Sequence, residues 1–231
     1  MDTFTGAFRF IGDNASLLVE KSIDTLWLAA AAILVALAIA QPLAVWLGHL
    51  HRGSFVAINL SNVGRALPTL AVLAIGITTP LGIGFSVALM ALVVLAVPVM
   101  LTNSYVAVDR VDPDAVEAAR GMGMTSFQIL TRVEIPLALP LIFAGIKTAA
   151  VYVVATAPVA SIAGGGGLGD ILFDQASYRE EGLVGASIVI ALLALTVQGV
   201  FTLLERAVTP RGLKLAGEEK PADEQVVLAQ A

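Results

Sequence analysis

The sequence predicts an all-α membrane protein, a polytopic helical bundle of about five transmembrane helices. Of its 231 residues, 58% are hydrophobic and only 13% are charged, and the mean hydropathy is +0.89. So much apolar surface cannot be the solvated exterior of a globular domain, whereas a bilayer covers it. Because lipid offers no hydrogen bonds to the backbone, each crossing needs about 20 largely apolar residues in a continuous helix.

Four stretches meet that length, at residues 25–47, 85–108, 138–162 and 183–204. The third contains one charge, Lys147, which we expect to snorkel or to pair with Glu134. A fifth and weaker span at 55–77 begins with polar residues. We expect it to break or bend near 64–68, because Pro68 removes a helix hydrogen bond and clashes with the preceding turn.

The basic residues predict how the spans are oriented, since loops rich in Lys and Arg stay in the cytoplasm. One side of a five-span arrangement holds Arg52, Arg110, Arg120, Arg132, Arg206, Arg211, Lys214 and Lys220, and the other holds Arg9, Lys21 and Arg179. The sequence therefore predicts an inner (cell) membrane protein with its N-terminus outside and its C-terminus in the cytoplasm. We divide it into an extracytoplasmic segment (1–24), a transmembrane domain (25–206) and a disordered cytoplasmic tail (207–231), which is too polar to fold.

Several chemistries are disfavoured by composition. The chain has no cysteine, so disulfides, iron–sulfur ligation and a thiolate nucleophile are excluded. The net charge of -5 comes without a basic face, so we expect no nucleic acid partner. His49 and His51 have no Cys or carboxylate at metal-ligand spacing, so we expect no metal site and no cofactor. We interpret both histidines as solvent-exposed loop residues.

The connection between the third and fourth spans of the five-span arrangement, residues 109–137, is far longer than two antiparallel helices need. Asp112 is a good N-cap with Pro113 behind it, and the composition then favours a short helix that Gly123 terminates.

A second short helix is predicted directly after this glycine. Thr125 and Gln128 form a capping box, and Phe127, Ile129 and Leu130 give the helix an apolar side before Pro136 ends it. The sequence therefore predicts two amphipathic helices on the cytoplasmic face, joined by a glycine turn.

The same residues carry a resemblance to a known family. Glu117, Ala118 and Ala119, followed at fixed spacing by Gly123, Val133, Ile135 and Pro136, resemble the EAA loop of binding-protein-dependent ABC importer permeases. In that family the loop inserts into a groove on a cytoplasmic ATPase. The resemblance implies that the ATPase-coupling residues are Glu117, Ala118, Ala119, Arg120, Met122 and Gly123.

Further residues of the sequence resemble one branch of this family in particular. Residues 41–43, 66–73, 117–144 and 164–172 are similar to permeases of the glycine betaine, carnitine and choline importers. The resemblance implies ATP-driven import of a small osmoprotectant. It also implies three protein partners, namely a separate ATPase, a second permease subunit that is identical or different, and an extracytoplasmic binding protein. A permease for another solute, such as methionine, remains an alternative.

Candidate residues for the translocation path are polar side chains of the weak span and aromatic rings that attract a quaternary ammonium by cation–π interaction. They are Asn59, Asn62, Arg65, Pro68, Tyr105 and Tyr152. The outer loop contributes Gly166, Gly167, Gly169 and Asp170. For the glycines we favour a tight turn with close packing over substrate contact, and for Asp170 a solvated loop over contact with a binding protein.

Two other functional classes fit less well. An ion-coupled secondary transporter relays charge through intramembrane Asp, Glu or His, which the apolar cores of the five expected spans lack. An intramembrane enzyme needs a nucleophile and a base, or a metal, facing one another. The sequence has neither cluster nor a P-loop, because the glycine run 164–169 lacks the Lys-Ser or Lys-Thr ending. We therefore expect a permease subunit that is not an enzyme.

Overall fold

The computed structural model describes residues 2–51, 55, 59, 62 and 68–208. Its α-helices are α1 (Asp2–Asp13), α2 (Ala15–His49), α4 (Thr69–Ile77), α5 (Phe85–Asp109), α6 (Pro113–Gly121), α7 (Ser126–Ile129), α8 (Ile135–Thr156), α9 (Leu168–Phe173) and α10 (Gln175–Val208). A π-helix at Leu130–Glu134 precedes α8, and a 3₁₀ helix at Ala157–Ala163 follows it. The described part is helical almost throughout, which confirms the predicted fold class.

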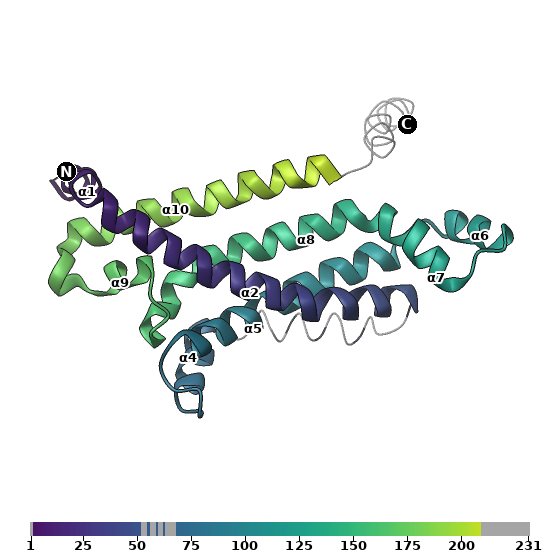
Figure 1. The fold of residues 1–231 in the computed structure, drawn as a ribbon, viewed down its shortest axis with the longest axis horizontal. Coiled ribbons are helices and arrows are strands. Elements are labelled where there is room, and N and C mark those ends of the chain that lie inside the picture. The colour runs from purple at the N-terminus through teal and green to yellow at the C-terminus, as the bar shows by residue number, and fades with distance from the viewer. Residues whose placement is uncertain (1, 52–54, 56–58, 60–61, 63–67, 209–231) are drawn as a thin grey trace, which may run out of the picture.

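Four long helices run along one axis and form the bundle (Figure 1). The segments long and apolar enough to cross a membrane are Ala15–His49, Phe85–Asp109, Ser126–Ala163 and Gln175–Ala207. Each contains one of the four clean spans that the sequence predicts. Of the weaker span, the structure describes α4 and a few isolated positions before it, so most of the expected break at 64–68 lies outside the described residues.

Small side chains let α2 and α5 approach closely. On α2, Ala32, Ala36, Ala40 and Ala44 follow one face and are fully buried. Lipid gives helices no hydrophobic reason to associate, so their contact depends on van der Waals packing, which small residues improve. At the end of this stripe a Cβ on Gly48 would lie 2.8 Å from the Cβ of Val108 on α5.

Two exposed tryptophans indicate where the bilayer meets α2. Trp27 is 70% exposed and Trp46 is 61% exposed. The nineteen residue steps from Trp27 to Trp46 correspond to about 28 Å of helix. This length matches the roughly 30 Å of hydrocarbon that a bilayer presents. Tryptophan is enriched at both membrane interfaces. The first three turns of α2 therefore project beyond the hydrocarbon, on the side that carries α1.

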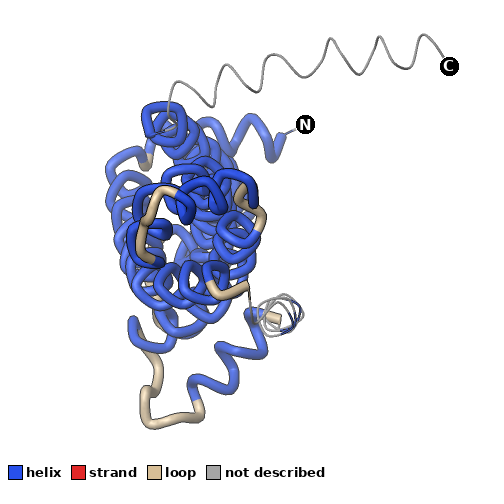
Figure 2. The backbone as a smooth tube through the Cα atoms, turned by 90° about the vertical axis from the view of Figure 1, so that its right-hand side faces the viewer, coloured by secondary structure: helices blue, strands red, loops and turns tan. Residues whose placement is uncertain are grey.

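The helix α1 was not predicted from the sequence. Figure 1 and Figure 2 both show that α1 runs across the long axis of the bundle, at the end opposite α6. Ala7 is fully buried, and the ring of Phe10 meets Tyr178 of α10 edge to face at 6.1 Å. Residues 1–24, expected only as an N-terminal segment, thus contain α1 and the start of α2.

The glycine-rich loop after the 3₁₀ helix is a tight, closely packed turn, as the sequence favoured. Gly164 and Gly167 have φ of +81° and +86°, which L-residues rarely adopt. A Cβ on Gly169 would lie 1.9 Å from the carbonyl oxygen of Pro158. The backbone N–H of Leu168 donates to the hydroxyl of Thr25 at 2.9 Å, which joins the loop to α2.

The expectation that Asp170 is a solvated loop residue is wrong. Asp170 lies in α9, and its carboxylate accepts a hydrogen bond from Lys21 Nζ at 2.6 Å. The pair joins α9 to the projecting turns of α2. Nearby, the backbone N–H of Ser177 donates to Asp174 at 3.1 Å, and hydrogen bonding from Ser177 lowers the pKa of Asp174.

Gly169→Ala should destabilise the protein, because the added methyl group overlaps the Pro158 carbonyl. We expect a loss of about 3 kcal/mol, the upper range for forcing extra volume into a packed site. The melting temperature of the detergent-solubilised protein measures the effect. Gly12→Ala is the matched control, since a Cβ there meets nothing within 4 Å. Equal melting temperatures for the two variants would contradict the packing assigned to this loop.

Candidate functional site

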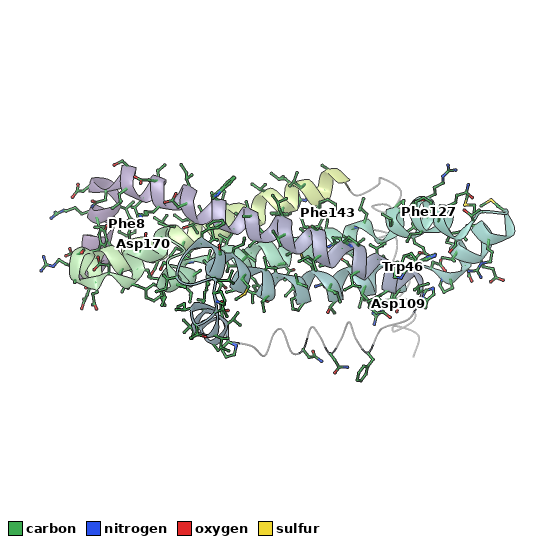
Figure 3. The ribbon with its side chains drawn as sticks, turned by 60° about the horizontal axis from the view of Figure 1, so that its bottom comes forward. Phe8, Trp46, Asp109, Phe127, Phe143 and Asp170 are labelled. Atoms are coloured by element: carbon green, nitrogen blue, oxygen red, sulfur yellow. The ribbon has the colours of Figure 1, made fainter. Side chains whose placement is uncertain are left out.

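The segment between α5 and α8 forms a separate structure at one end of the bundle. We refer to residues 110–134 as the α6–α7 segment. Figure 3 places Phe127 of this segment near the end that also holds Asp109, and places Phe8 and Asp170 at the opposite end. A long connection thus folds into short helices beyond the end of α5, as the sequence predicts.

Local hydrogen bonds determine where α6 begins and ends. Asp112 Oδ1 accepts from the backbone N–H of Asp114 at 3.0 Å, which confirms the predicted N-cap. At the other end, the N–H of Met124 donates to Ala119 O at 3.2 Å and that of Gly123 donates to Arg120 O at 3.0 Å. This bond pair is a Schellman motif, and Gly123 takes its left-handed position with φ of +82°.

One side of α6 faces the protein and the other is open. Ala119 is 1% exposed and packs inward. The other residues matched to the EAA loop, namely Glu117, Ala118, Arg120, Met122 and Gly123, are all exposed, with Met122 at 71%. The structure therefore brings five of the six predicted coupling residues onto one accessible surface, with Ala119 beneath them.

The short helix α7 extends this surface with an aromatic ring. The capping box is present, since Thr125 N donates to Gln128 Oε1 at 2.8 Å and Gln128 N donates to Thr125 Oγ1 at 3.4 Å. Ile129 is 3% exposed, whereas Phe127 is 74% exposed. Phe127 was predicted to lie on the apolar side of this helix but was not among the predicted site residues. The signal that could have indicated it is an aromatic residue only five positions after Met122 in the sequence.

The expectation that Pro136 ends the second short helix is wrong. The chain continues from α7 through the π-helix directly into α8, and Pro136 lies in the first turn of α8. Proline is tolerated there because the π-helical turn before it departs from the regular α-helical hydrogen bonding that the ring of Pro136 would interrupt.

Two expectations about His49 and Glu134 are also wrong. Glu134, the last residue of the π-helix, is only 2% exposed. Its carboxylate lies 2.6 Å from Nδ1 of His49, whose side chain is 14% exposed and lies in the last turn of α2. His49 Nε2 lies 2.6 Å from the hydroxyl of Ser126. His49 is therefore a partly buried bridging residue, and Glu134 is bonded to it and not to Lys147.

Lys147 instead forms an ion pair with Glu205 of α10, at 2.5 Å. The other histidine, His51, is 58% exposed in its side chain, as expected, and lies 3.0 Å from Asp109 at the end of α5. A charge within a membrane span normally has a partner. The first pair joins the middle of α8 to the last turns of α10, and the second joins the end of α2 to the end of α5.

The candidate path residues separate into distinct environments. Tyr105 is 3% exposed, so its ring is covered within the chain and its position argues against contact with a solute. Tyr152 is 52% exposed. It lines a hollow of about 210 Å³ between α8 and α10 with Lys147, Thr148, Val151 and Gln198.

The remaining candidates belong to the weak span. Asn59, Asn62 and Pro68 are exposed, and Arg65 lies outside the described residues. Within the part of the chain that the structure describes, no three His, Cys, Asp or Glu side chains are grouped so that they could hold a metal ion.

The apolar bundle and the polar segment at one end of it define a polytopic membrane protein with a folded polar connection between two of its long helices. The chain belongs to the family of binding-protein-dependent transport system inner membrane components, whose sequence profile matches residues 32–211. This confirms the family that the EAA-like residues indicated.

Relatives of known name agree with this family. The chain is 36% identical over 206 residues to the glycine betaine/carnitine/choline transport system permease protein OpuCB of Bacillus subtilis, covering 89% of this chain and 94% of that protein. It is 33% identical over 222 residues to the osmoprotectant import permease protein OsmW of Salmonella typhimurium, covering 93% and 100%. Among solved structures, an inward-facing MetNI methionine ABC transporter superimposes with a TM-score of 0.75 at 23% identity, covering 85% of this chain and 98% of that chain. That likeness shows the fold.

Gly123→Val should distort the turn after α6, because a β-branched residue with positive φ is strained by about 1–2 kcal/mol. Gly123→Asn adds a side chain of comparable size but tolerates the left-handed conformation. Nothing lies within 4 Å of a Cβ at this position, so the difference between the variants reports backbone conformation. We expect solute uptake to fall at least about tenfold with valine and to fall less with asparagine. Full uptake by both variants would contradict a functional role for the turn.

Proposed function

We propose that this chain is the membrane permease subunit of an ATP-driven ABC importer for a small osmoprotectant of the glycine betaine, carnitine or choline type. Two such subunits, identical or different, form the pathway, because one α6–α7 segment engages one ATPase and the motor has two. A separate ATPase hydrolyses the nucleotide, and an extracytoplasmic binding protein delivers the solute. The N-terminus is outside and the C-terminus is cytoplasmic, and residues 207–231 form a cytoplasmic tail.

The observation that carries this proposal is the exposed surface of the α6–α7 segment. Met122 and Phe127 are 71% and 74% exposed, beyond the ends of the apolar helices. Asp112, Glu117 and Arg120 of the same segment are also exposed, and charged side chains are costly in lipid. Exposed apolar side chains with a polar rim are typical of protein–protein contacts, in which Met and aromatic residues are enriched.

The shape of the segment suits a mechanical role. Both short helices begin at defined N-caps and α6 also ends in a Schellman turn, so the segment keeps its form when a partner pushes on it. Ala119 and Ile129 are buried within the segment, and Leu130 belongs to the apolar core of the bundle. A rigid knob of this kind converts closure of an ATPase into a rigid-body or hinge movement of the spans.

The solute class rests on the named relatives, whose titles give glycine betaine, carnitine, choline and osmoprotectants. Tyr152 is a residue of this chain that suits a quaternary ammonium, since its half-exposed ring lines the hollow between α8 and α10. A cation over an aromatic face gains about 0.5–2 kcal/mol. We place Asn59, Asn62, Arg65 and Pro68 on or near the path and assign Tyr105 to packing. Gly166, Gly167 and Gly169 shape the outer loop.

Replacing Glu117 by Lys should reduce ATPase co-purification with this chain by at least about tenfold, because it reverses a charge at the centre of the exposed surface. Met122→Asp should have a similar effect through loss of apolar contact. Both variants should remain in the membrane, since both side chains point away from the core. Glu180→Lys makes the same charge change on exposed α10 at the other end and should retain the ATPase. Normal retention by both docking variants would refute the docking surface.

The solute class is tested by deleting this subunit and measuring uptake at high osmolarity. Labelled glycine betaine, choline and carnitine are supplied separately, with labelled methionine as the alternative solute. We expect uptake of at least one of the three quaternary ammonium compounds to fall by about tenfold or more, because the deleted subunit supplies half of the proposed membrane pathway. Loss of methionine uptake alone would show that the solute class is wrong.

A further inference from the structure

The hydrogen bonds of His49 join two parts of the protein that the chain itself does not connect directly. His49 is in the last turn of α2, whereas Glu134 and Ser126 lie 85 and 77 residues further along the sequence. Both contacts are 2.6 Å long and use opposite ring nitrogens. When Nδ1 carries the proton and donates to the Glu134 carboxylate, Nε2 accepts from the Ser126 hydroxyl. A planar ring bonded on both sides has little freedom to turn.

The end of α2 is in turn fastened to α5. A Cβ on Gly48 would lie 2.8 Å from Val108 Cβ and 3.0 Å from the carbonyl oxygen of Tyr105, so the two backbones are in close contact. His51 follows in the left-handed conformation that ends the helix, with φ of +48°, and lies 3.0 Å from Asp109. Consequently a displacement of His49 displaces α2 and α5 together.

On the other side of the ring, Glu134 closes the π-helix that separates α7 from α8. π-helical turns are rare, are found mostly at functional sites and mark places where helix geometry departs from the α-form. A carboxylate that is 2% exposed is costly without a partner. The bond to His49 therefore ties the π-helix to α2, just where the α6–α7 segment meets the bundle.

We propose that His49 is a positioning residue that transmits movement of the α6–α7 segment to α2, in parallel with the covalent routes through α5 and α8. This rests on the proposed docking of the segment to an ATPase. Pressure on the exposed side of α7 moves Ser126 and Glu134, and the imidazole moves the end of α2 with them. Without this link the segment still binds its ATPase and still moves α5 and α8, but α2 follows only through its packing on α5.

The test compares four variants in the complete membrane complex, purified through a tag on this chain and reconstituted in liposomes with its ATPase and binding protein. His49→Ala removes both bonds. His49→Asn keeps a donor where Nδ1 stands, and Ser126→Ala removes the other contact alone. His49→Ala combined with Glu134→Gln also relieves the unpaired buried charge. The readouts are co-purifying ATPase, ATP hydrolysis, solute uptake per ATP hydrolysed, and melting temperature.

We expect His49→Ala to retain the ATPase and to hydrolyse ATP at a rate within about twofold of that of the unaltered complex. Uptake per ATP hydrolysed should fall about tenfold, the size of effect expected when a charge-assisted hydrogen bond is lost. His49→Asn should recover uptake per ATP to within about threefold, and the double variant should recover melting temperature but not uptake.

Three results would overturn the proposal. One is unchanged uptake per ATP in His49→Ala. Another is loss of the ATPase from this variant, which would make His49 part of the docking fold. The third is recovery of uptake in the double variant, which would attribute the loss to the unpaired carboxylate. Failure of the proposed function is distinguishable, because then no ATPase would co-purify with the unaltered chain.

Discussion

The apolar interior of the bilayer determines where this protein can place charge. A backbone crossing it must be helical, and a charged side chain within it must be paired or reach the interface. The long helices comply, since Lys147 is paired with Glu205 and Lys21 with Asp170. Polar side chains within the long helices, such as Asn103, Thr148 and Thr196, donate to backbone carbonyls of their own helix. The polar α6–α7 segment connects α5 to α8, and its position at one end of the bundle follows from this constraint.

The α6–α7 segment is joined to the bundle on its inner side and is exposed on its outer side. Leu130 belongs to the apolar core, and the bond between His49 and Glu134 joins the segment to α2. Its outer surface presents Met122 and Phe127. The family of the chain and the names of its relatives agree on a permease subunit of a transport system.

Local features of the fold were predictable from the sequence. The caps at Asp112 and Thr125 and the turn at Gly123 depend on residues within five positions, so residue type is enough to locate them. The four long spans follow from hydropathy over some 20 residues. The close packing at Gly169 was inferred from glycine content, although the atom it meets, the carbonyl of Pro158, could not be.

Contacts between distant residues were not predictable. Lys147 was expected to snorkel or to pair with Glu134, yet helix packing places Glu205 of α10 beside Lys147 and His49 of α2 beside Glu134. The helix α1 was missed because residues 2–13 are too few and too polar to be predicted as a membrane span. Burial of Tyr105 and exposure of Tyr152 also became visible only once the helices were packed.

The central claim is that the α6–α7 segment faces the cytoplasm and contacts a separate ATPase. Because the chain has no cysteine, Met122→Cys provides a single thiol on the exposed surface for a membrane-impermeant maleimide. The account predicts no labelling in intact cells, strong labelling in inverted membrane vesicles stripped of the ATPase, and protection when the ATPase is restored. Labelling from outside intact cells, or labelling of inverted vesicles that is unaffected by the ATPase, would contradict it.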